Sequence, residues 1–394
     1  MLNHLKTPNR ILLIVVFILN MVSIELASQT QDLQHQTSAI NIEVQVRVFQ
    51  GDTFINNLIL EDFEVYEDGV LQKVEAVYLV NKNNIEREET AILKEQAYQI
   101  FSPEVSRHFV LMFEIMDHMP QLDEAIDYFF QDIITPIDTL HVVTPVNTYH
   151  FKPEALAQMP KEKISKQLKS KLRSDIIKGS LDYKSAMRSL EKIFTFGVDP
   201  DLQRSMFVDQ ARILKDLRSF SEERMETLAD FLKAQPGQKQ LFLFYQSEQI
   251  PLLSTLDDYQ KLELIEDLFF DLDKVKQLFS DSSISAHFLY VTLKNNQDWL
   301  NTPETMMPLR VEYYDQSNEI YNAFKEIART TGGIIDSSKN PGFLFRKAAD
   351  ASENYYLLYY TPKNYLADGT FKKIEVKVKG EKYSVTHREG YFAD

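Results

Sequence analysis

Three polar residues that follow directly on an apolar run are the first candidates for chemistry in this chain. The stretch FVLMFEIMDHMP begins at Phe109; Glu114 ends its apolar run, and Asp117 and His118 come soon after. Carboxylate and imidazole groups grouped in this way could bind a divalent cation or exchange protons with a substrate. Their use depends on the elements that bring other polar residues beside them.

The middle of the chain, residues 105–353, alternates apolar runs with helical patterns. The runs at 107–114, 138–146, 238–246 and 284–291 are typical of strands buried on both faces. Shorter strands are predicted at 148–151 and 332–338, and helices at 120–134, 160–235, 257–280, 315–330 and 341–353. This alternation predicts an α/β fold with a mostly parallel sheet and helices on both faces. The residues that directly follow the parallel strands are then expected at one edge of the sheet.

The two ends of the chain have β character instead. In residues 40–80, alternating apolar residues start at Ile42, and Asp68-Gly69 separates two β-rich runs as a hairpin turn would. Residues 81–104 resemble an irregular linker, and residues 354–394 contain three further strand patterns. Three strands are too few for a stable sandwich. We therefore expect one small antiparallel β-sandwich-like domain formed by both termini, with the α/β domain inserted between them.

The first residues resemble an export signal. Lys6 and Arg10 precede the apolar run 11–24, so residues 1–28 are predicted to be a signal peptide or an N-terminal anchor. The run is shorter than the roughly 20 residues of a bilayer span. Membrane contact is expected only if this segment stays uncleaved. Residues 29–39 are polar and are predicted to be a flexible lead-in.

Charge and cysteine content exclude some classes of function. The formal net charge of the 394 residues is −15, which argues against nucleic acid as a partner. The chain has no cysteine, which excludes disulfides, thiolate chemistry and lipoprotein attachment. We find no nucleotide-binding loop, no zinc-protease motif and no nucleophile elbow, so we do not expect an enzyme.

Two flanking motifs resemble those of a known family. The stretch LILEDFEVYEDGVLQKV (58–74) and the stretches YYLLYYTPKNYLADGTFKKIEVKV (355–378) and REGYF (388–392) are similar to the opening and closing motifs of bacterial exported proteins related to von Willebrand factor A (VWFA). The resemblance implies a Rossmann-like VWFA-type domain with a metal-ion-dependent adhesion site. In that site an Asp-x-Ser-x-Ser turn, a Thr from a second loop and an Asp from a third bind the ion.

This sequence departs from that pattern at every ligand position. Glu114 replaces the first Asp, and Met116 and His118 replace the two Ser residues. In the predicted second loop, KGSLDYKSAM (178–187), Ser180 or Leu181 stands at the Thr position, and in the third loop Gln246 replaces the Asp. A thioether is a poor ligand for Mg²⁺ or Ca²⁺. We therefore expect no cofactor and a degenerate site, whose rim comprises Glu114, Met116, Asp117, His118, Ser180, Leu181, Asp182, Gln246 and Glu248.

Other interpretations of the polar and aromatic residues remain open. A zinc site could use Glu114, Asp117, His118, His150, Asp182 and Glu248, although their spacing matches no known signature. His141 and His287 lie within apolar strands and are expected in the core. The basic stretch 161–173 could lie on an anionic membrane, but packing of Ile164, Leu168 and Leu172 in the core is favoured. The tyrosines of 355–360 are expected partly in the core, with one exposed aromatic face.

These patterns predict an exported, non-catalytic protein-binding module, periplasmic, on the cell surface or secreted. Its expected partner is a protein at the cell envelope, bound at the rim. Two alternatives remain: a structural or assembly component of the envelope, and a metal-dependent adhesin with an altered ion site.

Overall fold

The computed structural model describes residues 40–91, 103–195, 199–217, 222–246, 249–253, 271–292, 311–315, 317–380 and 382–393. The predicted export segment 1–28 and the lead-in 29–39 lie outside these residues. Residues Asn41–Asp394 form one compact unit. The chain is of the mixed α/β class, which confirms that part of the prediction. No helix in the described ranges is long and apolar enough to cross a membrane.

Strands from the two ends of the chain pair with each other in two antiparallel sheets. The first has the order β17 (Ser384–His387), β1 (Ile42–Gln50), β15 (Asn354–Tyr360), β5 (Val74–Asn81) and β6 (Asn84–Thr90), with β2 (Thr53–Phe54) beside β1. The second has the order β18 (Gly390–Phe392), β16 (Phe371–Val378), β3 (Phe63–Glu67) and β4 (Val70–Gln72). The turn between β3 and β4 places Asp68 and Gly69 at φ 48° and 78°, as a tight hairpin requires.

A hydrophobic core lies between these two sheets. Val44 and Val46 of β1 pack in one cluster with Val65 of β3 and Val376 of β16. The charged residues that alternate with the buried residues of β16 face outward. The alternation of the sequence is therefore the alternation of buried and exposed faces. A short 3₁₀ helix, η1 (Leu60–Asp62), precedes β3.

The prediction of an irregular linker at 81–104 is wrong in part, because β6 occupies Asn84–Thr90 and pairs with β5. Its sequence NIEREET carries four charged residues on an edge strand, where side chains meet solvent, so it lacks the apolar alternation on which the prediction depended. Residues 92–102 lie outside the described ranges.

A six-stranded sheet forms the centre of the chain. Its order is β14 (Ile335–Ser338), β12 (Ile284–Val291), β10 (Gln238–Gln246), β7 (Arg107–Glu114), β8 (Thr139–Val143) and β9 (Thr148–Phe151). All neighbours are parallel except the edge strand β9, which is antiparallel to β8. Two further strands, β11 (Gln249–Leu253) and β13 (Val311–Asp315), pair only with each other.

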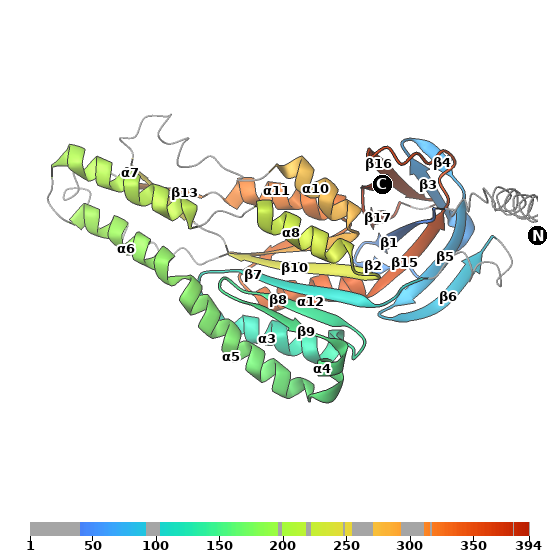
Figure 1. Cartoon of the computed structure of the whole chain (residues 1–394), viewed down its shortest axis with the longest axis horizontal. Helices are drawn as coiled ribbons and strands as arrows, with labels where there is room; N and C mark the ends of the chain where they lie inside the picture. Colours follow the sequence, from blue (N-terminus) through green and yellow to red (C-terminus); the bar gives the residue numbers. More distant parts are fainter. Residues whose placement is uncertain are drawn as a thin grey trace, which may run out of the picture. The chain divides into compact units, whose positions relative to one another are not determined.

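Helices cover both faces of this sheet (Figure 1). One face packs against α3 (Pro120–Tyr128), its π-helical continuation η2 (Phe129–Ile133), α4 (Pro153–Gln158), α5 (Lys161–Gly179) and α12 (Pro341–Glu353). The other face packs against α8 (Glu222–Lys233), α10 (Leu272–Asp281) and α11 (Ser317–Thr330). Helices α6 (Leu181–Thr195) and α7 (Pro200–Asp216) lie side by side.

The helical region 160–235 is therefore not one long stretch. Four helices, α5 to α8, replace it, and the first break comes at Ser180. Within α5 the apolar residues Ile164, Leu168 and Leu172 are buried, which confirms the packed stripe expected there. Of the helix predicted at 257–280, the described part is α10; residues 254–270 lie outside the described ranges.

The tyrosines of β15 are buried on both faces, so the expected exposed aromatic face is wrong. Tyr356 and Tyr360 pack in the sandwich core, and Tyr355 and Tyr359 pack with Tyr78 of β5 on the opposite face. The reason is that one face of β15 meets the sandwich core and the other face packs in a second apolar cluster, against which Val105 lies. A polar group therefore has to meet each hydroxyl within the protein; Tyr360, for example, donates to Glu67 at 2.7 Å.

Candidate functional site

The candidate site begins where β7 ends. Residues Phe109–Phe113 are buried on both faces, and Glu114 is the last residue of the strand. Met116, Asp117 and His118 form the turn that follows, and Pro120 starts α3. Proline suits this first helical position because it lacks the N–H that would have no partner there. The polar residues of the turn are thereby held at the C-terminal edge of the sheet.

Gln246 closes this turn from the neighbouring strand. It is the last residue of β10, which runs parallel to β7, and its side chain is 2% exposed. Its Oε1 accepts the backbone N–H of Met116 at 2.9 Å and that of Asp117 at 3.0 Å. Its Nε2 lies 3.4 Å from Oδ2 of Asp117. One amide side chain therefore ties both backbone donors of the turn to the sheet.

Glu114 is paired with a cation from the protein. Its Oε1 lies 3.1 Å from the guanidinium of Arg224 on α8. Burial raises the pKa of the Glu114 carboxyl above its ordinary value, and the charge and hydrogen bond of Arg224 oppose that rise. The arginine thus supplies positive charge beside Glu114, the residue that the family resemblance aligns with the first metal ligand.

The other two polar groups of the turn also have partners. Oδ1 of Asp117 lies 2.7 Å from Nζ of Lys184 on α6, and both side chains are about half exposed. His118 Nε2 lies 3.3 Å from Oδ1 of Asp123 on α3. The turn therefore presents ion pairs and hydrogen bonds to its neighbours, with the Asp117–Lys184 pair accessible to solvent.

The predicted second loop is wrong, because residues 178–187 are helical. Gly179 ends α5, Ser180 caps it, and Leu181 begins α6. Ser180 is buried and its hydroxyl donates to the carbonyl of Ile177 at 3.2 Å, whereas Leu181 and Asp182 are exposed. From this segment, Lys184 contacts the site through Asp117.

A close contact explains why the last residue of α5 is a glycine. A Cβ on Gly179 would lie 2.3 Å from Cβ of Pro145, in the connection between β8 and β9. Only glycine permits this approach.

Glu248, the remaining predicted rim residue, lies outside the described residues.

The residues present do not fit the metal ion that the family resemblance implies. The thioether of Met116 is a poor ligand for a hard cation, and the Gln246 oxygen already accepts two backbone donors. Glu114 and Asp117 are each paired with a basic side chain. No described part of the chain brings together three His, Asp or Glu side chains that could hold a metal.

The histidines of the alternative zinc set are separated. His150 on β9 contacts His141 on β8 through their Nδ1 atoms, away from the turn after β7. His141 is half buried and packs against the Phe231 ring, so its expected place in the core is wrong: it faces the edge strand of the sheet. His287 is fully buried and bonds Gln240 Oε1 at 2.8 Å, which confirms its place in the core.

Sequence reasoning missed the two cations of the site, Arg224 and Lys184. Both lie on surface helices: Arg224 is 110 residues from Glu114 in the sequence, and Lys184 is 67 residues from Asp117. A basic residue on an amphipathic helix carries no local signal of a distant partner. Only the packing of α6 and α8 near the strand ends reveals the pairs.

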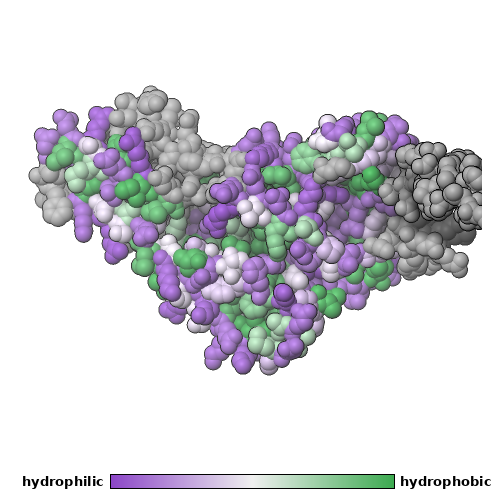
Figure 2. Space-filling model, viewed as in Figure 1, coloured by the Kyte–Doolittle hydropathy of each residue, from purple (hydrophilic) through white to green (hydrophobic). Residues whose placement is uncertain are grey.

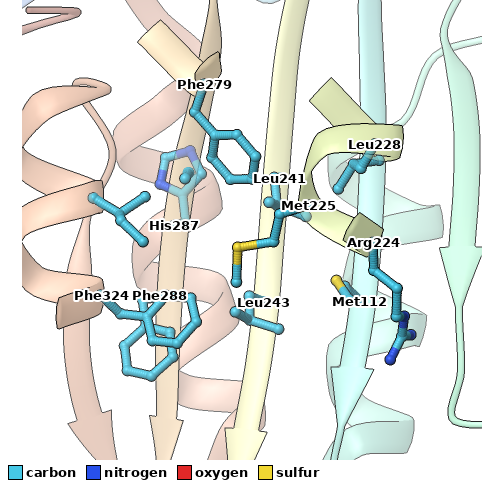
Figure 3. Close-up of a pocket in the computed structure, with 12 residues that line it drawn as sticks. Met112, Arg224, Met225, Leu228, Leu241, Leu243, Phe279, His287, Phe288 and Phe324 are labelled. Atoms are coloured by element: carbon cyan, nitrogen blue, oxygen red, sulfur yellow. The ribbon is translucent and has the colours of Figure 1, made fainter. Parts of the chain in front are cut away.

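A small apolar pocket lies beside the site, beneath α8 (Figure 3). Arg224 lies at its edge next to Met112, and the remaining side chains are nearly all apolar, among them Met225 and Phe324. Its free volume is about 20 Å³. That is room for about one or two water molecules, so we assign no ligand to it.

Comparisons with known proteins add little. No family model and no curated protein matches the chain. Among solved structures, the crystal structure of the human COPII-coat protein Sec24c is similar with a TM-score of 0.29 and 7% sequence identity. The match covers 73% of this chain and 43% of that chain, so this chain spans less than half of that protein. A likeness at this level carries no argument about function.

Proposed function

We propose that the chain is an exported, non-catalytic protein-binding module of the VWFA type that binds its partner without a metal ion. The observation that carries this proposal is the pairing of Glu114 with Arg224 and of Asp117 with Lys184 at the strand ends. Protein side chains there supply the positive charge that a cation supplies in the adhesion site of the resembling family.

The fold supports the A-type assignment. A parallel sheet has helices on both faces, and open sheets of this kind bind ligands at the C-terminal ends of their strands. The turn after β7 lies at that edge, held by Gln246 of β10. The flanking motifs at 58–74 and 355–378 contain strands of both sheets of the sandwich.

The exposed pair at the rim is the proposed contact for a partner. Asp117 and Lys184 have side chains 52% and 44% exposed, so a partner can reach both charges. A mixed pair of charges selects for complementary charges on the partner and affects the association rate more than the affinity. The export segment and the envelope location are part of the proposal, and they depend on residues 1–28.

A capture experiment tests this proposal. Wild-type protein and a variant with alanine at Glu114, Asp117 and His118 are used as bait for an envelope extract, with and without EDTA. We expect a protein that binds the wild type with or without EDTA and is lost with the variant. The control has alanine at Asp368 and Glu375, exposed acids of the sandwich. Equal capture by all three baits would refute the rim; capture abolished by EDTA would favour the metal-dependent adhesin.

A second candidate function is assembly of an envelope structure. Helix α7 exposes an apolar stripe, Leu202, Met206 and Ile213, opposite the side on which Phe207 and Ala211 are buried. Hydrophobic residues are interspersed with hydrophilic ones over α6 and α7 in the space-filling view (Figure 2). Native mass spectrometry distinguishes the two candidates: a stable oligomer that dissociates when Leu202 and Met206 become Gln favours assembly.

A further inference from the structure

Two histidines lie directly opposite each other at the edge of the central sheet. His141 of β8 and His150 of β9 are partners in the antiparallel register of these two strands. Their Nδ1 atoms are in contact at 2.5 Å, and their ring planes meet at 81°. The pair uses no residue of the rim, so its role is independent of the proposed function.

The contact between the two rings is accessible to solvent. The strand β9 is the edge strand of its sheet, and His150 is exposed, whereas His141 is half buried. The ring of Phe231 on α8 packs against His141, with 4.9 Å between the ring centroids. One imidazole is therefore held in place by an aromatic neighbour, and the other can turn toward a ligand from solvent.

A third histidine in the same sheet shows how a structural histidine is used in this protein. His108 of β7 bonds through Nδ1 to the hydroxyl of Thr139 at 2.6 Å and through Nε2 to the carbonyl of Pro236, also at 2.6 Å. Both of its ring nitrogens thus have protein oxygens as partners. The Nδ1 atoms of His141 and His150 meet a second imidazole instead, which is also a metal-binding group.

The protonation of the pair leaves a lone pair available for a metal ion. Burial, followed by the charges of His150 and His108, lowers the pKa of His141 to about 4. His141 is therefore neutral at pH 7, and in a neutral pair one Nδ1 donates a hydrogen to the lone pair of the other. If the donating ring carries its hydrogen on Nε2 instead, both Nδ1 lone pairs point to the same place and no proton is released.

The ligand type restricts the choice of ion. Neutral imidazole suits Zn²⁺, Cu²⁺ and Ni²⁺, whereas Mg²⁺ and Ca²⁺ prefer oxygen ligands. Two nitrogens on one tetrahedral zinc lie about 3.3 Å apart, because each Zn–N bond is about 2.0–2.1 Å long. The two rings would have to separate by less than about 1 Å, which a rotation of the exposed His150 side chain allows.

We propose that His141 and His150 form a two-histidine site for one divalent transition-metal ion with the preferences of Zn²⁺. The ion binds between the two Nδ1 atoms and joins the edge strand β9 to β8. The described residues bring no group of three His, Asp or Glu side chains together, so water completes the coordination of the ion.

Calorimetric titration of the full chain with Zn²⁺ tests the site in solution. The wild type should bind one more Zn²⁺ ion per chain than His150→Asn, a change at an exposed residue that the fold should tolerate. The matched control, Thr148→Asn at another exposed position of β9, should bind as many ions as the wild type. Equal stoichiometry in the wild type and His150→Asn would overturn the proposal, whatever other zinc sites the chain has.

Crystals of the full chain soaked in zinc chloride locate the ion. Data collected above the zinc absorption edge should show an anomalous peak about 2.0–2.1 Å from Nδ1 of His141 and from Nδ1 of His150. Soaking with magnesium chloride should leave the two rings in contact. Zinc peaks at other positions only, or no peak, would contradict the assignment.

Discussion

The carboxylate of Glu114 at the end of β7 lies 3.1 Å from the guanidinium of Arg224 on α8. The pair joins the sheet to a helix that covers it, at the position where the sequence resemblance predicts the first ligand of a cation. Its consequence is a rim in which positive charge comes from the protein itself.

Loss of the arginine should destabilise the fold through the acid that it leaves behind. For Arg224→Met we expect the free energy of unfolding to fall by about 1 kcal/mol. This is less than for a fully buried pair, because the Arg224 side chain is 45% exposed. Urea unfolding of the wild type, both single variants and the double variant with Glu114→Gln measures the coupling. Additive effects of the two changes would show that the pair contributes nothing.

The pH dependence of stability should carry the signature of Glu114. Burial raises the pKa of its carboxyl above 4.5, with Arg224 opposing, so the folded state holds this proton more tightly than the unfolded state. Stability from this group is therefore greatest below pH 4.5 and is lost as the pH rises through the folded-state pKa. The free energy of unfolding of the wild type should fall relative to Glu114→Gln over that window. Parallel pH profiles of the two proteins would rule out the shift.

The side chain of Gln246 should stabilise the turn after β7 through its hydrogen bonds. Gln246→Leu keeps the size but removes the acceptor of two backbone N–H groups, at a cost of about 1–3 kcal/mol. The amides of Met116 and Asp117 should then exchange their hydrogens faster. The matched control, Gln158→Leu at the exposed end of α4, should leave both measurements unchanged. Unaltered exchange in Gln246→Leu would refute the role assigned to this side chain.

Among the ion pairs named here, substitution in the buried pair of Arg107 and Asp138 should destabilise the fold most. Asp138 is fully buried, lies 2.7 Å from the Arg107 guanidinium and also accepts Asn83 Nδ2 at 2.8 Å from the β5–β6 turn. Asp138→Ala should cost about 3–5 kcal/mol because it leaves a buried cation without its partner. Denaturant unfolding measures this, with Asp132→Ala, an exposed acid nearby, as the control. A cost below that of the control would contradict the assignment.

Much of the fold can be predicted from local patterns. The alternation in β1 and β16 reflects one face in the sandwich core, and the continuous apolar runs of β7 and β10 reflect burial on both faces. Asp68-Gly69 predicts its turn because only such residues tolerate positive φ there. In each of these cases the cause lies within a few residues of the feature.

The parts that could not be predicted depend on contacts between distant residues. The strand β6 has the composition of a loop and is defined by its pairing with β5. The need for glycine at position 179 follows from its close approach to Pro145, and the burial of Tyr355 follows from its packing with residues of β5. The position of Gln246 was predicted from the family pattern, but its two hydrogen bonds to the turn could not be.

Calorimetric titration of metal-free protein with Mg²⁺ and Ca²⁺ tests the central claim most directly. The ion pairs of Glu114 and Asp117 and the hydrogen bonds of Gln246 predict no saturable heat from either ion at the rim. A saturable signal for a single site that disappears in Glu114→Ala would contradict the account, since it would show that the carboxylate exchanges its arginine for a cation.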